Sequence, residues 1–487
     1  MLAIAAALPI VVAMALFLAR AKAVNMALWS LATGLAVALV FFPAGPGKWL
    51  DAGVLFGPTI IEVLLILFGG VLLSRITTET GAMASISGWL GRSASHPQAG
   101  TVLVVFGLVP FAESVTGFGI GVTVGVPLLL RLGHDVRRAA VLSLLGLVAV
   151  PWGALGPGTL VAADLAGLSL QDMGVRSALL SPPVMLGSAL TCWLVLRRGA
   201  ERPGRLLAHL VAAALLLNCG ILAANLLMGT PPAGIVGSLV VILVHLAAFK
   251  IAGSLVPAGP QVLRSLLPYG VLTAGLLLAR LATMGMDASL SKRALASGGV
   301  WLLIACLVAH HLAPERGTNA RPLGSRMHAA YRSWIPVGVT TGAFTVLGAI
   351  LALSGMGQEL GSTLAAMGPA YLVLGPIAGG FAGFISGSNT GANSMLAATQ
   401  AQAALAMGSS VLQLVAASNV AASMATMLAP SRILLAYEMA ALDPGRDSDP
   451  DAEHPGEQEV TAWVAPKIAA LLACVCTLLG VVTWVIH

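Results

Sequence analysis

Residues 384–392 read FISGSNTGA, and this short polar run interrupts an apolar region that is otherwise long enough to cross a bilayer. A helix that stops within a membrane leaves backbone N–H groups unpaired at its N-terminus. Gly, Ser, Asn and Thr are small residues that let the backbone bend and approach a ligand closely. The run therefore predicts two half-helices that meet at a broken tip inside the membrane.

A second run of this kind lies about 270 residues earlier, where residues 111–119 read FAESVTGFG. Each run precedes a helix that ends at a proline, Pro151 in one half and Pro430 in the other. The surrounding hairpins are predicted near 100–130 and near 369–408. Because basic loops face the cytoplasm, the first hairpin is expected to enter from the cytoplasm and the second from outside. Two similar halves of opposite orientation predict an inverted repeat.

The composition places the rest of the chain in lipid. Hydrophobic residues make up 58% of the chain and charged residues 9%, whereas soluble domains carry about 25% charged residues. The apolar runs are continuous rather than alternating, so they indicate helices and not barrel strands. We predict an all-α polytopic membrane protein with about 12 spanning helices plus two broken re-entrant hairpins. The formal net charge of +6 reflects basic loops, so no nucleic-acid partner is expected.

The predicted organisation has four parts: N-terminal peripheral helices in 1–52, repeat 1 in 53–200, connecting scaffold helices in 201–333, and repeat 2 in 334–487. No spacing of Cys or His indicates a metal site. The spans contain no nucleophile–base constellation either. We therefore expect no metal, cofactor or catalytic residue, and the protein is predicted not to be an enzyme.

The two tips supply the groups that bind a small organic anion. A helix N-terminus carries a partial positive charge that suits a carboxylate, while hydroxyls and unwound carbonyls suit Na⁺ or a proton donor. Helix packing explains any one of these small residues as well, and it is the pair of tips that favours ligand binding. The candidate substrate-binding residues are Ser114, Thr116, Gly117, Gly119, Ser386, Ser388, Asn389, Thr390, Asn393 and Arg432.

Charged residues inside apolar segments are costly and usually functional. Glu113 is the candidate for proton coupling, and the alternative is a structural Glu bound to a basic residue or a helix end. Arg432 is the candidate for a bidentate contact to a carboxylate. It could equally pair with Glu438 or extend to the interface. For Glu62, a functional and a structural role both stay open.

The chain resembles the lactate permease family, which includes glycolate permeases. A first match covers about 107–170 and a second about 379–442, together about a quarter of the chain. The matching motifs are FAE at 111–113, TGFG at 116–119, WGALG at 152–156, GSNT at 387–390, AASN at 416–419 and APS at 429–431.

The resemblance implies secondary active transport of a small monocarboxylate, lactate or glycolate, by proton symport across the bacterial inner membrane. It also implies two halves that move against a scaffold, often as a homodimer. The sequence departs from the family pattern at Asn389, where Asp is common, and at Arg432, where a smaller polar residue is common. A bulkier or more acidic anion is therefore an alternative substrate. The alternative mechanism is a Na⁺-coupled organic-anion carrier of the same superfamily, with Na⁺ at the Asn389 tip.

Overall fold

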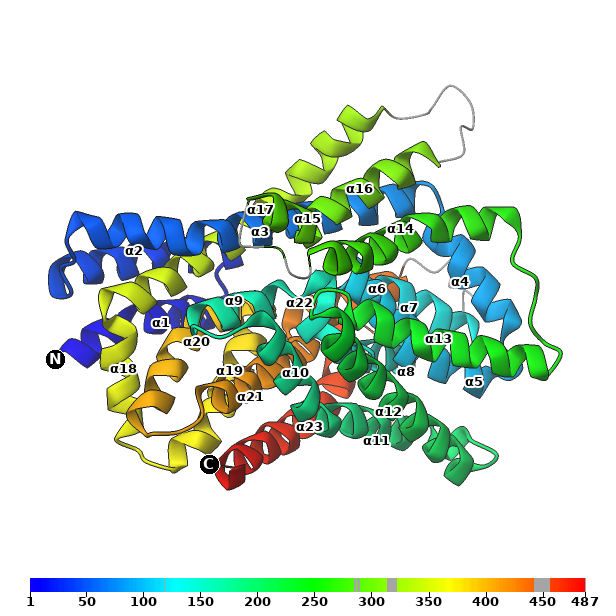
Figure 1. The fold of residues 1–487 in the computed structure, drawn as a ribbon. Helices are drawn as coiled ribbons and strands as arrows, with labels where there is room; N and C mark the ends of the chain where they lie inside the picture. Colours follow the sequence, from blue (N-terminus) through cyan, green and yellow to red (C-terminus); the bar gives the residue numbers. More distant parts are fainter. Residues whose placement is uncertain (118, 284–285, 287–289, 313–321, 442–455, 487) are drawn as a thin grey trace.

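The computed structural model describes the whole chain except residues 118, 284–285, 287–289, 313–321, 442–455 and 487. The described residues form helices and turns, with no strand among them (Figure 1). Nine of these helices are long and apolar enough to cross a membrane, and two bent helix pairs raise the number to 11. The predicted all-α polytopic fold is confirmed, with a span count close to the predicted one.

The first half of the chain and the connecting helices follow one another without long loops. The elements are α1 (Leu2–Leu18), α2 (Ala23–Phe41), α3 (Pro46–Glu79), α4 (Ala82–Ser93), α5 (Pro97–Leu103), a π-helical turn (Val104–Leu108), α6 (Val109–Thr116), α7 (Ile120–Arg131), α8 (Val136–Leu145), a 3₁₀ segment (Leu147–Leu155), α9 (Pro157–Leu165), α10 (Leu170–Leu180), α11 (Pro182–Leu196), α12 (Pro203–Met228) and α13 (Ala233–Ile251).

The second half begins after α13. Its elements are α14 (Pro260–Thr283), α15 (Leu290–Ala296), α16 (Gly298–His311), α17 (Leu323–Ser354), α18 (Met356–Ala365), α19 (Ala370–Ser386), α20 (Asn389–Ala406), α21 (Val411–Ala425), a 3₁₀ turn (Thr426–Leu428), α22 (Pro430–Ala441) and α23 (Glu457–Ile486).

The two halves repeat one order of elements. In each half, a long helix and a short helix are followed by a broken hairpin, then by a helix, a 3₁₀ segment and a further helix. Thus α3 and α4 correspond to α17 and α18, α6 and α7 to α19 and α20, and α9 to α22. The pair α1 and α2, which precedes α3, corresponds to α14 and α16, which precede α17.

The helices of the two halves contact one another in reciprocal pairs. Helix α2 packs on α17 while α16 packs on α3, and α1 packs on α18 while α14 packs on α4. Helix α9 packs on the hairpin helix α20, and α22 packs on the hairpin helix α7. Such an exchange is what a pseudo-twofold relation between two repeats produces. The predicted repeat is confirmed, while the domain boundaries at 52, 200 and 333 stay a prediction.

Glycines break both hairpins at the predicted places. Helix α6 ends at Gly117, with φ of 69°, and α7 starts after Gly119, with φ of 83°. Helix α19 ends at Gly387, with φ of 60°, directly before the N-cap Ser388 of α20. Residues with a side chain rarely adopt this left-handed conformation. The glycines therefore fix where each half-helix stops and where its partner starts.

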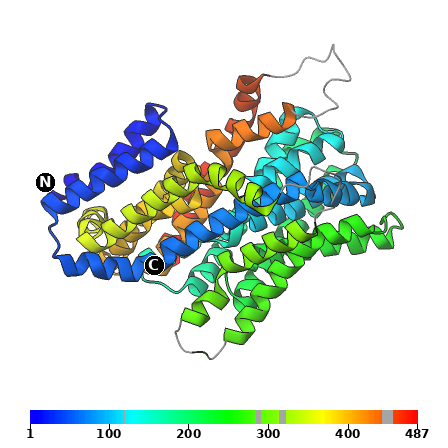
Figure 2. The ribbon, with the colours of Figure 1, turned by 90° about the horizontal axis from the view of Figure 1, so that it is seen from above.

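Exposed apolar side chains cover the outer helices. Leu39 on α2, Val54 on α3, Leu227 on α12 and Leu278 on α14 are each more than half exposed. In water such surfaces would favour association, whereas in a bilayer lipid tails cover them. Helices α1 and α2 lie at one end of the molecule beside the second-half helices α18 to α20, and α12 and α13 lie at the other end (Figures 1 and 2).

Candidate functional site

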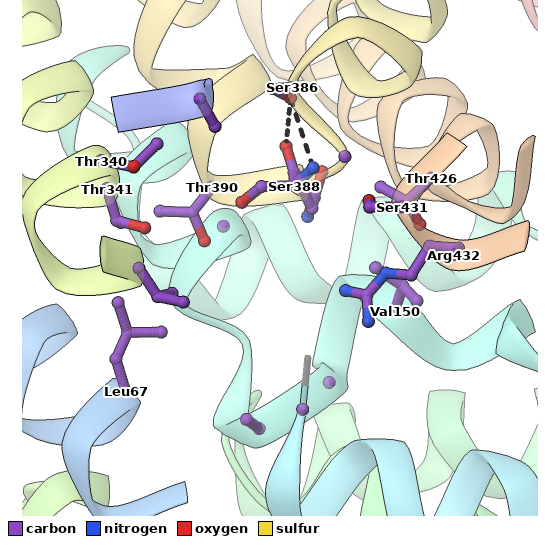
Figure 3. Close-up of a pocket in the computed structure, with 18 of the residues that line it drawn as sticks. Leu67, Val150, Thr340, Thr341, Ser386, Ser388, Thr390, Thr426, Ser431 and Arg432 are labelled. Atoms are coloured by element: carbon purple, nitrogen blue, oxygen red, sulfur yellow. Dashed lines mark hydrogen bonds between the residues drawn. The ribbon is translucent and has the colours of Figure 1, made fainter. Parts of the chain in front are cut away.

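A cavity of about 570 Å³ lies where the two hairpin tips meet α9, α17, α22 and the start of α2 (Figure 3). Among its lining residues, Lys22, Ser431 and Glu438 are exposed, whereas Glu113 and Asn389 are buried. The cavity therefore runs from an accessible surface to a buried polar floor. Its size is within the range of small-molecule sites.

Most of the sequence-predicted site residues line this cavity: Glu113, Gly117, Ser386, Ser388, Asn389, Thr390 and Arg432. Ser114, Thr116, Gly119 and Asn393 are not lining residues. The Thr116 hydroxyl donates to the Ala112 carbonyl at 2.5 Å, and Ser114 faces Gly234 of α13. The structure thus gathers the tips and Arg432 at one cavity, while substrate contact by each residue stays a prediction.

Glu113 caps the N-terminus of α7. Its two carboxylate oxygens accept from the Gly119 N–H at 3.0 and 3.2 Å, and one of them also accepts from the Gly121 N–H at 3.3 Å. An acidic group is favoured at this position because the helix N-terminus carries a partial positive charge. The helix-end role considered for Glu113 is therefore observed. Its side chain also lines the cavity, so a role in coupling stays a prediction.

The matching half-helix α20 has only a neutral cap. The Ser388 hydroxyl accepts from the Gly391 N–H at 3.2 Å, and the Ser386 hydroxyl donates to the Ala382 carbonyl at 2.7 Å and accepts from the Ser388 N–H at 3.3 Å. No carboxylate satisfies this end among the described residues that line the cavity near it. The partial positive charge of α20 is therefore directed at the cavity, where an anion can bind.

Arg432 extends from the first turn of α22 into the cavity (Figure 3). Within the described part of the chain its guanidinium forms no ion pair, either with Glu438 or with another residue. It lies against Gly119, whose N–H is bonded to Glu113, so the Glu113 charge also acts on it without a direct ion pair. A half-buried cation without a counter-ion favours the arrival of an anion, because burying an unpaired charge is costly.

Substituting Gly119 by Ala is expected to raise the KM for the transported anion about tenfold. A Cβ at this position would take the space of the Arg432 guanidinium, which would have to move. The matched control is Gly133→Ala, because Gly133 has φ of 88° and open space around it. Both substitutions carry the left-handed strain of about 1–2 kcal/mol. Uptake kinetics that change equally in both variants would contradict this explanation.

A buried amide cluster joins the hairpin tip of one half to the other half. Asn419 of α21 accepts at its Oδ1 from the Asn389 and Asn393 side-chain amides at 2.9 and 2.8 Å. Its own Nδ2 donates to Thr159 of α9 at 3.2 Å and to Ser177 of α10 at 3.0 Å. Asn393 is thus part of the support for the tip. Sequence reasoning noted Asn419 only as part of a family motif.

The Asn419→Ala substitution is expected to lower the free energy of unfolding by about 2 kcal/mol, because it leaves buried donors and acceptors without partners. The comparison variant is Asn218→Ala, since Asn218 is also buried but its Oδ1 already lacks a partner within the described chain. Thermal unfolding of the detergent-purified protein measures the difference. An equal fall in Tm for both variants would show that the cluster does not stabilise the fold.

The inverted repeats and the polar cavity between two broken hairpins define a multi-pass membrane protein of the transporter class. Comparison with known proteins then identifies the family: the sequence profile of the L-lactate permease family matches residues 2–284 and 278–449, so the chain belongs to that family. It is a multi-pass protein of the bacterial inner membrane.

Two curated relatives agree with this assignment, and one solved structure has a similar fold. The chain is 26% identical to an L-lactate permease of Streptococcus iniae over 376 residues, which cover 70% of this chain and 77% of the relative. It is 25% identical to the L-lactate permease of Escherichia coli K12, with 89% of both chains covered. The Alcanivorax borkumensis YdaH transporter, described as having an unusual topology, superimposes with a TM-score of 0.52 at 15% identity over 94% of this chain and 98% of that one. This last likeness concerns the fold alone.

Proposed function

We propose that the protein carries lactate, or the closely related glycolate, across the inner membrane by proton symport. The observation that carries the proposal is the open N-terminus of α20 at the same cavity as the unpaired guanidinium of Arg432. Both groups bind carboxylates. The names of the curated relatives support lactate as the substrate.

In this proposal the substrate carboxylate accepts hydrogen bonds from the start of α20 and from Arg432. The hydroxyls of Thr341 and Thr390 point into the space beside that position (Figure 3) and can donate to the 2-hydroxyl. The Thr340 hydroxyl is already bonded to the Pro336 carbonyl at 2.7 Å. A small 2-hydroxy acid thus has a partner for each of its polar groups.

Glu113 is the proposed proton carrier. Among the described residues, the hydrogen bonds to its carboxylate are donated by backbone N–H groups. A proton on this group would remove its negative charge and replace one acceptor by a donor, which would weaken the cap on α7. Protonation would therefore loosen the first tip from the start of α7. A change of this kind at the cavity wall is a physical means of coupling a proton to substrate movement.

Sodium coupling at the Asn389 tip is the less favoured mechanism. The side-chain oxygens of Asn389 and Asn419 already accept from the Asn393 amide at 3.0 and 2.8 Å. These two amide oxygens are therefore already occupied by a protein donor. This favours the proton as the coupling ion.

The test is uptake of labelled lactate by proteoliposomes that contain the purified protein. An inward proton gradient, with no Na⁺ present, is expected to drive lactate above its equilibrium concentration. Accumulation that requires a Na⁺ gradient would replace the proton by Na⁺. A failure to take up lactate or glycolate under either gradient would overturn the substrate assignment.

A further inference from the structure

The start of α2 reaches the same cavity, although α2 precedes the first broken hairpin by many residues. Lys22 is the N-cap of α2, and Lys22, Ala23 and Val24 line the cavity. Among the residues that the structure describes, no side chain accepts a hydrogen bond at this end. Within the described part of the chain, the Lys22 ammonium forms no hydrogen bond or ion pair. A second helix N-terminus and a second unpaired cation thus line the substrate space.

The helix in the other half that corresponds to α2 shows which group such a helix start binds. Helix α16 corresponds to α2, and its start is held by Glu62 of α3: the Ser297 hydroxyl donates to one carboxylate oxygen at 2.7 Å, and the Gly299 N–H donates to the other at 3.2 Å. Helix α17 corresponds to α3 and contains no acidic residue. Pro336 and Val337 of α17 line the cavity beside the start of α2.

The hairpin tips have the same asymmetry. Glu113 occupies the start of α7, and at the corresponding start of α20 the described residues place the Ser388 hydroxyl and no carboxylate. The chain therefore supplies its own carboxylates, Glu113 and Glu62, at one member of each pair of helix ends. The other two ends, at α20 and α2, both line the cavity. Glu113 and Glu62 thus occupy the starts of α7 and α16, whereas the corresponding starts of α20 and α2 are open to the carboxylates of a ligand.

We propose that the cavity also accepts small dicarboxylates, with one carboxylate at α20 and Arg432 and the second at Lys22 and the start of α2. Figure 3 shows the ribbon of α2 on the opposite side of the cavity from Arg432. Arg432 and the start of α2 therefore lie on opposite sides of the cavity, as the two carboxylates of one bound molecule require. Glu438 is the other acidic residue besides Glu113 among the lining residues described, and it belongs to the Arg432 helix. The inference rests on the proposed function because it uses the same site.

Malate is the probe, since it carries the 2-hydroxy acid group of lactate and a second carboxylate. Malate is expected to inhibit labelled lactate uptake, and labelled malate is expected to enter the proteoliposomes. The Lys22→Gln variant should raise the inhibition constant of malate about tenfold while changing the KM for lactate less than about twofold. Lys22→Arg, which keeps the charge, should restore malate inhibition.

The matched control is Arg20→Gln, which removes the same charge from the same connection at an exposed residue that does not line the cavity. It should leave the malate and lactate constants unchanged. If the unsubstituted protein takes up lactate but neither binds nor carries malate, the inference is wrong and the proposed function stands. If Lys22→Gln retains normal Tm and normal malate inhibition, Lys22 is not the second contact. Malate uptake without lactate uptake would instead overturn the proposed function.

Discussion

Replacement of Arg432 by Gln is expected to lower kcat/KM for lactate uptake about 100-fold. The guanidinium is half-buried, has no ion partner within the described residues, and lines the cavity opposite the start of α2. Removing a charged donor that meets a carboxylate in a desolvated site costs about 2–5 kcal/mol. Most of the loss should appear in KM, because the contact is made to the bound anion before any conformational change.

Arg432→Lys keeps the charge but loses the planar pair of donors, so it should recover only part of the activity. The control is Arg131→Gln, because Arg131 is exposed at the end of α7 and lies away from the cavity lining. Initial rates of labelled lactate uptake over a range of concentrations give both constants. Normal KM in Arg432→Gln, with protein of unchanged Tm, would exclude Arg432 from the substrate site.

Local sequence signals were enough to predict the broken hairpins. The runs at 111–119 and 384–392 contain glycines at the positions where the backbone has positive φ. Each break therefore lies at a residue type that adopts this conformation readily. The apolar runs between them predicted the helical spans. These features depend on residues that are adjacent in the chain, which is why a single sequence was sufficient.

The individual contacts of the site could not be predicted in the same way. Ser114 and Thr116 lie in the first motif, but Thr116 bonds its own helix backbone and Ser114 faces α13. A polar residue in a helix can satisfy itself through the carbonyl four residues earlier, so its type does not reveal which way it points. The motif therefore located the tip, but the types of its residues did not show which side chains face the cavity.

The contacts that the sequence did not predict join residues that are far apart in the chain. Lys22 belongs to no motif in the sequence, because its place at the cavity depends on the packing of α2 against α17. Likewise, Glu62 meets Ser297, and Asn419 meets Thr159, across more than two hundred residues of chain. The only signal for these contacts was the repeat itself. Once α2 is matched to α16, the carboxylate at one helix start draws attention to its absence at the other.

The two tips are related by the repeat but differ in chemistry, and this difference can separate substrate binding from coupling. A carboxylate of the chain occupies the first tip, whereas hydroxyl groups cap the second. An identical pair of tips would give two equivalent anion positions. In the proposed function, the second tip binds the transported anion, and Glu113 at the first tip is the proton carrier.

Replacement of Glu113 by Gln is accordingly expected to abolish proton-driven accumulation of lactate, while exchange of lactate across the membrane continues at a reduced rate. Gln keeps the size of Glu and one acceptor oxygen, but its amide cannot titrate. The Gln oxygen can keep the bonds from Gly119 and Gly121 that one carboxylate oxygen accepts, but the amide nitrogen, a donor, replaces the other oxygen, which accepts from the Gly119 N–H. The cap on α7 is thus weakened permanently, as it would be in the protonated state. Lactate movement is then no longer coupled to proton movement.

Proteoliposomes loaded with unlabelled lactate measure exchange, and empty ones with an imposed proton gradient measure accumulation. Glu438→Gln is the control, because Glu438 lines the same cavity but is exposed and belongs to α22. It should keep both activities. Proton-driven accumulation by Glu113→Gln at the normal level would show that another group carries the proton. Loss of exchange as well, together with a lower Tm, would assign Glu113 to the structure of the tip alone, because a coupling residue is needed for the gradient and not for exchange.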